Sequence, residues 1–119
     1  MSAMEKINVV SIIGNNICVA AEDGQKVYDA IFKALQEGKN IEISFKGIED
    51  LTSLFLNAAI GQLYDKFKDD ELKKRLFVVD ASPQDLETLK RSVERAKEYF
   101  KDPERFHSAT DEILGHDNE

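Results

Sequence analysis

The residues with the clearest chemical potential gather in one short polar segment. Glu49 and Asp50 are neighbouring carboxylates, and Thr52 and Ser53 are neighbouring hydroxyls that precede an apolar, helix-like run. A hydroxyl at a helix start caps the helix by accepting from a free backbone N–H group. A phosphoryl group there would be attracted by the free N–H groups and repelled by the two carboxylates. Thr52 and Ser53 are therefore candidate helix caps and candidate phosphorylation sites.

The other reactive side chains form no catalytic or metal-binding pattern. Cys18 is the single cysteine and has no histidine near it in the sequence, so we expect a buried structural thiol. His107 and His116 have neither a nearby cysteine nor a second ligand at helical spacing. The glycines do not form a phosphate-binding loop. We therefore expect no catalytic residues, no metal and no cofactor, and the protein is not predicted to be an enzyme.

The segment that follows is predicted to be an amphipathic helix from Ser53 to Phe67. At about 100° per residue, its core-facing side consists of Phe55, Leu56, Ala59, Ile60, Leu63 and Phe67. The opposite side carries Leu54, Asn57, Ala58 and Gly61. A leucine beside small residues, which would let a partner approach closely, favours a partner-binding surface together with Glu49 and Asp50. The alternative is a solvated loop followed by one ordinary exposed leucine.

Hydrophobic periodicity and turn residues predict the elements that position this segment. The first elements are a β-hairpin over 7–13 and 17–20 and a helix that is capped by Asp23 and stopped by Gly38. A strand over 41–45, a loop over 47–52 and the helix over 53–67 follow. The last elements are a charged connector over 72–75, a central strand over 77–79, and a helix that begins at Ser82–Pro83 and ends at Asp102–Pro103. The fold class is therefore α/β in the order β-β-α-β-α-β-α. We expect a mixed sheet covered by helices mainly on one face, because polar residues alternate with apolar ones between Ile41 and Phe45.

Composition restricts the classes of partner. The chain has 119 residues, 42% of them hydrophobic, and a formal net charge of -7. Six acidic residues and one arginine lie between positions 102 and 119, so the preceding part is nearly neutral. We expect one domain over 1–101 and an acidic, flexible tail over 102–119. Neither part has the basic patch that nucleic acid requires. The sequence shows no apolar run of membrane-spanning length and no signal peptide, so we expect no membrane partner and a cytoplasmic location.

Four segments together resemble the family of STAS-like domains of unknown function, over roughly Ala21 to Phe100. They are DGQKV from Asp23, FKGI from Phe45, LTSLF from Leu51 and LKKRLFVV from Leu72. The resemblance implies a STAS-like fold related to the bacterial anti-sigma factor antagonists, which bind a histidine-kinase-like ATPase. In those proteins phosphorylation of a serine at the start of the second helix releases the partner. Aligning strand and helix places Leu54 on that serine, Ser53 on the serine before it and Thr52 on an aspartate.

The resemblance therefore implies a non-catalytic protein–protein interaction module in bacterial regulation, which binds through the loop over 49–54 and the following helix. Because Leu54 cannot be phosphorylated, a phosphorylation switch would have to use Ser53, either in a register shifted by one residue or because the geometry of Ser53 itself permits it. The alternative function is a small-ligand or nucleotide-binding sensor domain. Self-association is a separate expectation, because the acidic tail offers contacts to Lys90, Arg91, Arg95 or Lys97 of the same chain or of a second subunit in a homo-oligomer.

Overall fold

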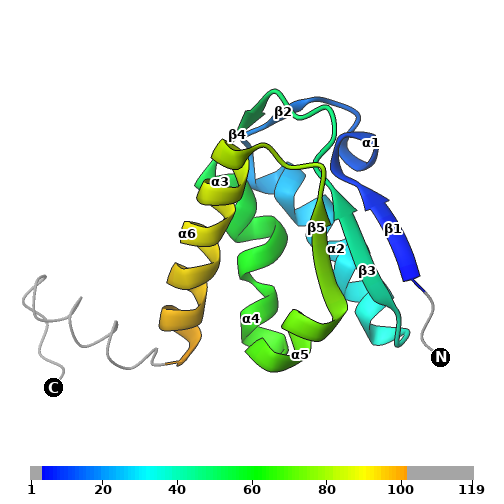
Figure 1. The fold of residues 1–119 in the computed structure, drawn as a ribbon, viewed down its shortest axis with the longest axis vertical. Helices are drawn as coiled ribbons and strands as arrows, with labels where there is room; N and C mark the ends of the chain where they lie inside the picture. Colours follow the sequence, from blue (N-terminus) through cyan, green and yellow to red (C-terminus); the bar gives the residue numbers. More distant parts are fainter. Residues whose placement is uncertain (1–3, 102–119) are drawn as a thin grey trace, which may run out of the picture.

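Figure 1 shows a computed structural model of the protein, which describes residues 4–101. Its elements are β1 (Met4–Asn8), α1 (Val9–Ile13), β2 (Ile17–Cys18), α2 (Ala21–Gln36), β3 (Asn40–Ser44), β4 (Asp50–Leu51), α3 (Ser53–Leu56), the π-helix η1 (Asn57–Gly61), α4 (Leu63–Lys66), α5 (Asp69–Arg75), β5 (Leu76–Val79) and α6 (Pro83–Lys101). The predicted α/β class is confirmed, although the order of elements differs from the predicted one. The predicted tail, with His107 and His116, lies outside the described residues.

The predicted N-terminal hairpin is wrong. The β-rich run leaves the sheet after Asn8, whose side-chain Oδ1 accepts from the Ser11 backbone N–H at 2.8 Å and so caps α1. Val9 is buried within this short helix, so core packing outweighs the strand preference of β-branched residues. Gly14 then ends α1 in the left-handed conformation, with φ of 70°. As a result β2 never returns to β1, and it pairs with β4 instead.

Both sheets are parallel throughout. Strands β1, β3 and β5 form one sheet with β3 in the centre, and β2 and β4 form a separate pair. The mixed sheet and the central place of the strand over 77–79 were therefore wrongly predicted, because β5 is an edge strand. The helices cover one face of the larger sheet, as expected: Ile41 and Ile43 are fully buried, whereas Glu42 and Ser44, which alternate with them, keep contact with solvent. On that open face Phe77 lies opposite Glu42.

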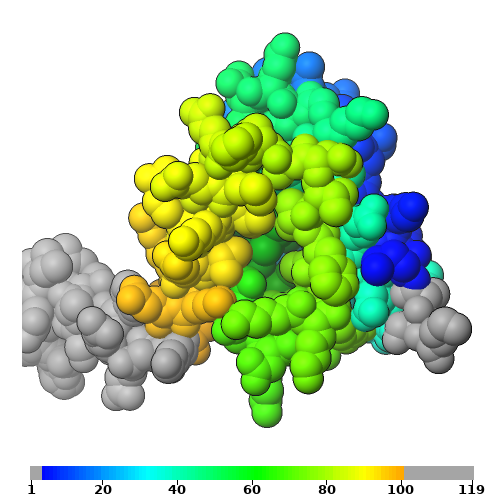
Figure 2. Space-filling view, viewed as in Figure 1, coloured from blue at the N-terminus to red at the C-terminus, as the bar shows by residue number. Residues whose placement is uncertain are grey.

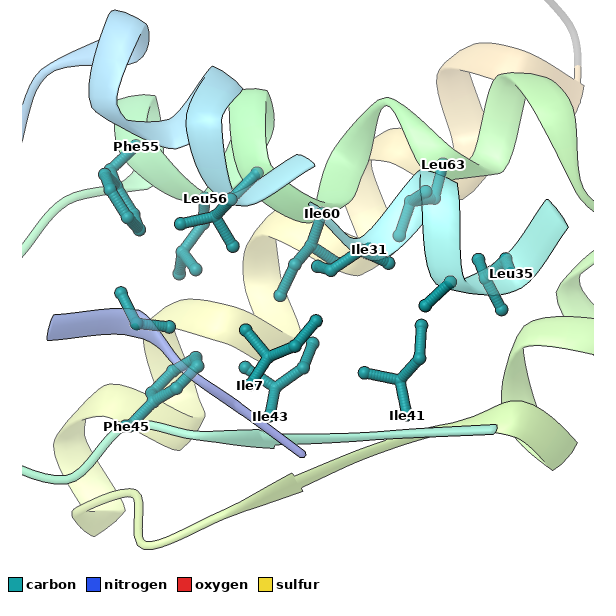
Figure 3. Packing of buried hydrophobic residues seen from close by; sticks show 14 of the residues in the cluster. Ile7, Ile31, Leu35, Ile41, Ile43, Phe45, Phe55, Leu56, Ile60 and Leu63 are labelled. Carbon is teal, nitrogen blue, oxygen red and sulfur yellow. The ribbon is translucent and has the colours of Figure 1, made fainter. Parts of the chain in front are cut away.

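The core fills the space between this sheet and the helices. In Figure 3 the side chains of Ile7 and Ile43 point from the strands toward Ile31 of α2 and Ile60 of η1, and all four are buried. The predicted core face of the helix after Ser53 is confirmed at Phe55, Leu56, Ala59, Ile60 and Leu63, all of which are buried. Toward β5 the molecule is hollowed: the space-filling view in Figure 2 shows a depression between α6 and β5, and apolar side chains of both elements line it.

Helix α2 crosses the helix of the candidate site at very short range. Asp23 was predicted to cap α2, but α2 begins at Ala21 and Asp23 lies within its first turn. Gly24 follows and is buried against the neighbouring helix: a Cβ atom there would lie 2.5 Å from the Phe55 carbonyl oxygen and 2.9 Å from Ala58 Cβ. The Asp-Gly pattern therefore marks a helix crossing rather than a helix start. The stop at Gly38 is confirmed, since its φ is 79° and its N–H donates to the Leu35 carbonyl.

The predicted charged connector over 72–75 is instead the end of a helix, α5. Its first turn is acidic and its last turn is basic, which suits the helix dipole. Arg75 ends it and donates from Nη2 to the carbonyl oxygens of Leu35 at 2.8 Å and Lys39 at 2.9 Å. This side chain thus ties the end of α2 and the residue before β3 to the start of β5. The arginine of the LKKRLFVV segment therefore has an architectural role.

No helix within residues 4–101 is both long enough and apolar enough to cross a membrane. No group of three or more His, Cys, Asp and Glu side chains in the same range is placed to hold a metal ion.

Candidate functional site

The loop over 45–52 is fastened to the segment between α1 and α2. The Glu49 N–H donates to the Asn16 carbonyl at 2.8 Å, and the Thr52 N–H donates to the Cys18 carbonyl at 3.1 Å. These bonds extend the β2–β4 pair and fix the loop beyond the carboxyl end of β3, at the upper end of the molecule in Figure 1. Loops beyond the carboxyl ends of parallel strands are common binding places in α/β proteins. The carboxylates of Glu49 and Asp50 are exposed there.

Thr52 is the N-cap of α3, as predicted. Its Oγ1 accepts from the Phe55 N–H and donates to the Val19 carbonyl, both at 3.2 Å. Both hydrogen-bonding directions of the hydroxyl are thus used, and a phosphoryl group on Thr52 would remove the proton that it donates to the Val19 carbonyl. The neighbouring Ser53 is exposed, and its hydroxyl has no hydrogen-bond partner within residues 4–101. Of the two candidate phosphorylation sites, Ser53 has the accessible hydroxyl.

Leu54 projects into solvent at this end of the molecule. Its side chain is 59% exposed, as the helical periodicity predicted, and Asn57 on the next turn is exposed too. Val19 is 38% exposed. Its carbonyl accepts a hydrogen bond from the hydroxyl of Thr52, which lies two residues before Leu54 in the chain. The sequence contains no sign that Val19 is exposed, because its place in a short apolar segment resembles that of a buried strand residue. We call Val19, Glu49, Asp50, Leu54 and Asn57 the Leu54 surface.

The prediction that the small residues of this helix face a partner is wrong for Gly61. Gly61 is buried under α6, where a Cβ atom would lie 3.6 Å from Ala96 Cβ. Ala58 is half-buried at the crossing with α2, beside Gly24. The physical reason is that two helices flank this one, α2 on one side and α6 on the other, and both require small residues at the contact. Leu54 and Asn57 near the start of the helix are exposed and available to a partner, whereas Gly61 is not.

The helix widens into a π-turn directly after Leu56, the last residue of α3. The Gln62 N–H donates to the Asn57 carbonyl, five residues earlier, at 3.1 Å. The side chain of Gln62 returns to the same turn, because Nε2 donates to the Ala58 carbonyl at 2.7 Å and to Gln25 Oε1 at 2.9 Å. Such turns often occur at functional sites. The periodicity of the sequence, which indicated a regular helix, contains no signal for this one.

Cys18 lies behind the loop and is buried, as predicted. Burial, and then the negative charges of Asp23 and Asp85, raise the pKa of its thiol to about 11. The thiol is therefore protonated near neutral pH, and since the thiolate is the nucleophilic form, Cys18 is a poor nucleophile.

Comparison with protein families gives one match. A family model described as a STAS-like domain of unknown function matches residues 23–86, more than half of the chain. The matched range begins at the α2 crossing, includes the whole loop and the helix of the Leu54 surface, and ends in the first turns of α6. Comparison with curated proteins and with solved structures finds no match.

Proposed function

Because this chain belongs to the family of STAS-like domains of unknown function, we propose that it is a non-catalytic protein–protein interaction module in bacterial regulation. The mode of binding would be similar to that of an anti-sigma factor antagonist. The Leu54 surface is the contact region. Ala58 contributes at its edge, whereas Gly61, which is buried, does not take part.

The observation that carries the proposal is the exposure of Leu54. Two exposed aliphatic side chains, Leu54 and Val19, belong to segments that the Thr52–Val19 hydrogen bond joins, and the loop just before Thr52 carries the exposed carboxylates of Glu49 and Asp50. An apolar centre with a charged rim is the usual composition of a protein interface. The complementary partner would offer an apolar pocket flanked by basic side chains. A histidine-kinase-like ATPase is the partner class that the family resemblance indicates, and a gene for such an ATPase beside the gene for this protein would support the proposal.

Ser53 is the proposed site of control. A phosphoryl group on its hydroxyl would add up to two negative charges beside Glu49 and Asp50. The phosphoryl group would stand next to the apolar Leu54 side chain and would lose its hydration when Leu54 enters an apolar pocket, and this desolvation cost would weaken the complex. Incubation with the ATPase and ATP, followed by mass analysis, should place the added phosphoryl group on Ser53. Ser53→Ala should block the modification, and modification of Thr52 alone would contradict this assignment.

The binding surface is tested by two matched substitutions. Leu54→Asp places a charge in the centre of the Leu54 surface, and Met4→Asp makes the equivalent change at a side chain of β1 that is 47% exposed. With the purified ATPase, calorimetry should show at least about a hundredfold loss of affinity for Leu54→Asp, the size expected for an interface anchor. Met4→Asp should bind as the wild type does. Equal affinities for the two variants, with both folded by circular dichroism, would overturn the proposal.

A further inference from the structure

A polar cavity of about 280 Å³ lies between α6 and the start of α3. It is lined by Leu51, Ser53, Thr88, Arg91, Ser92 and Arg95. The four residues from α6 follow a spacing of three, four and seven positions, so they share one side of that helix. Among the described residues, the lining includes two arginines and no carboxylate. The lining is thus positively charged, although the net charge of the chain is -7.

Ser92 provides an observation independent of the charge. It is 4% exposed, and its Oγ atom has no hydrogen-bond partner within residues 4–101. Leaving a buried hydroxyl unpaired costs stability, and such groups are rare in folded proteins. Thr88, one turn earlier on the same wall, satisfies its hydroxyl by donating to the Gln84 carbonyl at 3.1 Å. Ser92 Oγ is therefore a buried donor without a partner, on a residue that lines the cavity.

The two arginines are also without counter-charges. Neither Arg91 nor Arg95 forms an ion pair with another residue in the range 4–101, whereas the nearby Lys97 pairs with Asp69 at 3.3 Å. Two guanidinium groups and two serine hydroxyls around one cavity form a set of donors. Guanidinium groups bind the oxygens of phosphate with short, charge-assisted hydrogen bonds.

We propose that this cavity binds a phosphate group, as inorganic phosphate or as the monoester of a small metabolite. Arg91 and Arg95 supply the charge, and Ser53 and Ser92 donate hydrogen bonds to the remaining oxygens. The volume lies just below the range of sites for drug-sized ligands, so the ligand is small. The site does not rest on the proposed interaction, because the unmodified chain alone would bind its ligand.

The test is a titration of the full-length, ¹⁵N-labelled protein with inorganic phosphate, with sodium chloride at equal ionic strength as the reference. We expect saturable shifts of the Ser53 and Ser92 amide signals and a Tm that rises with phosphate concentration. A parallel titration with glycerol 3-phosphate identifies the source of the phosphate group. Tighter binding than that of inorganic phosphate indicates a monoester, and weaker binding indicates the free ion.

Two matched double variants separate the cavity from general charge attraction. Arg91→Gln with Arg95→Gln should weaken phosphate binding at least about tenfold. Lys74→Gln with Lys90→Gln removes the same charge from exposed positions outside the cavity and should leave the affinity unchanged. If both double variants lose the same affinity, or if phosphate causes no shifts localised at the cavity, the response is that of an adventitious ion only and the proposal is overturned.

Ser92→Ala supplies a readout that distinguishes ligand binding from a structural role. Without phosphate, this variant should have a Tm equal to or above that of the wild type, because the unpaired hydroxyl is gone. Its Tm should rise less than that of the wild type when phosphate is added. A Ser92→Ala variant that binds phosphate as tightly as the wild type does would contradict the assignment.

Discussion

At the scale of single residues, the Thr52 hydroxyl holds the Leu54 surface together. One hydroxyl caps α3 through Phe55 N–H and anchors the residue after β2 through the Val19 carbonyl. Thr52→Ala removes both bonds, so we expect a loss of about 1–2 kcal/mol in the free energy of unfolding, the usual size for a lost N-cap. Thr52→Ser keeps the hydroxyl and should lose less than half of that. Urea denaturation measures both, and an unchanged stability of Thr52→Ala would contradict the dual role.

Cys18 makes stability depend on pH in the alkaline range. Burial raises the pKa of its thiol from an ordinary value of 9.0 to about 11. Between these values the unfolded chain has released the proton and the folded chain has not. The unfolded state then binds fewer protons, so stability falls as pH rises from about 9 to about 11, by on the order of 2 kcal/mol. Below pH 9 the thiol contributes no pH dependence.

Cys18→Ala provides the reference for this effect. The difference in unfolding free energy between wild type and variant should be constant up to about pH 9 and should then fall steadily. Tyr64, whose pKa burial and Asp69 raise to about 12, titrates in both proteins and therefore cancels. Parallel curves for the two proteins across this range would show that the buried thiol is not the source.

At the scale of elements, the helix crossings depend on which small residue stands at each contact. Gly24→Ala would place a Cβ atom 2.5 Å from the Phe55 carbonyl oxygen, whereas at Gly61 the nearest atom would be Ala96 Cβ at 3.6 Å, an ordinary contact. We expect Gly24→Ala to destabilise the protein by about 1–3 kcal/mol through overpacking. Gly61→Ala should be neutral or should stabilise by up to about 1 kcal/mol, because alanine favours a helix. Thermal denaturation orders the two, and the reverse order would contradict the described crossings.

The same elements show how far the sequence predicts this fold. Periodicity found the buried face from Phe55 to Leu63, and turn chemistry found Gly38 and the Ser82 cap, whose Oγ accepts from the Asp85 N–H. These features depend on local geometry. The sequence did not reveal that Val9–Ile13 is a helix, because burial against α2 overrides the preference of valine and isoleucine for strands. The sequence pattern did not indicate helix α5, because Leu72 is its one buried residue and a single apolar position produces no helical periodicity.

In the candidate site too, the features set by local geometry were predicted from the sequence, and those set by tertiary packing were not. The exposure of Leu54 and the cap at Thr52 came from spacing along a single helix. Gly61 was misplaced because its contact belongs to α6, thirty-five residues further along the chain. Val19 and the cavity residues of α6 come near Ser53 only through tertiary packing, which periodicity within one segment does not contain.

At the scale of the whole molecule, the candidate sites concentrate at one end. The loop after β3, the start of α3 and the β2–β4 pair meet beyond the carboxyl ends of the parallel strands (Figure 1). The open face of the larger sheet is the competing surface, since Met4 and Phe77 are 47% and 42% exposed on it. Single exposed apolar residues are normal, so exposure alone does not rank the two surfaces. The acidic rim and the exposed Ser53 hydroxyl favour the Leu54 surface as the binding surface.

Methyl NMR of the protein bound to its ATPase partner tests this choice most directly. The methyl groups of Leu54 and Val19 report on the Leu54 surface, and that of Met4 reports on the open sheet face. On addition of unlabelled partner, the Leu54 and Val19 signals should shift or broaden while the Met4 signal stays in place. Perturbation of Met4 with unchanged Leu54 and Val19 signals would contradict the account and move the interface to the sheet.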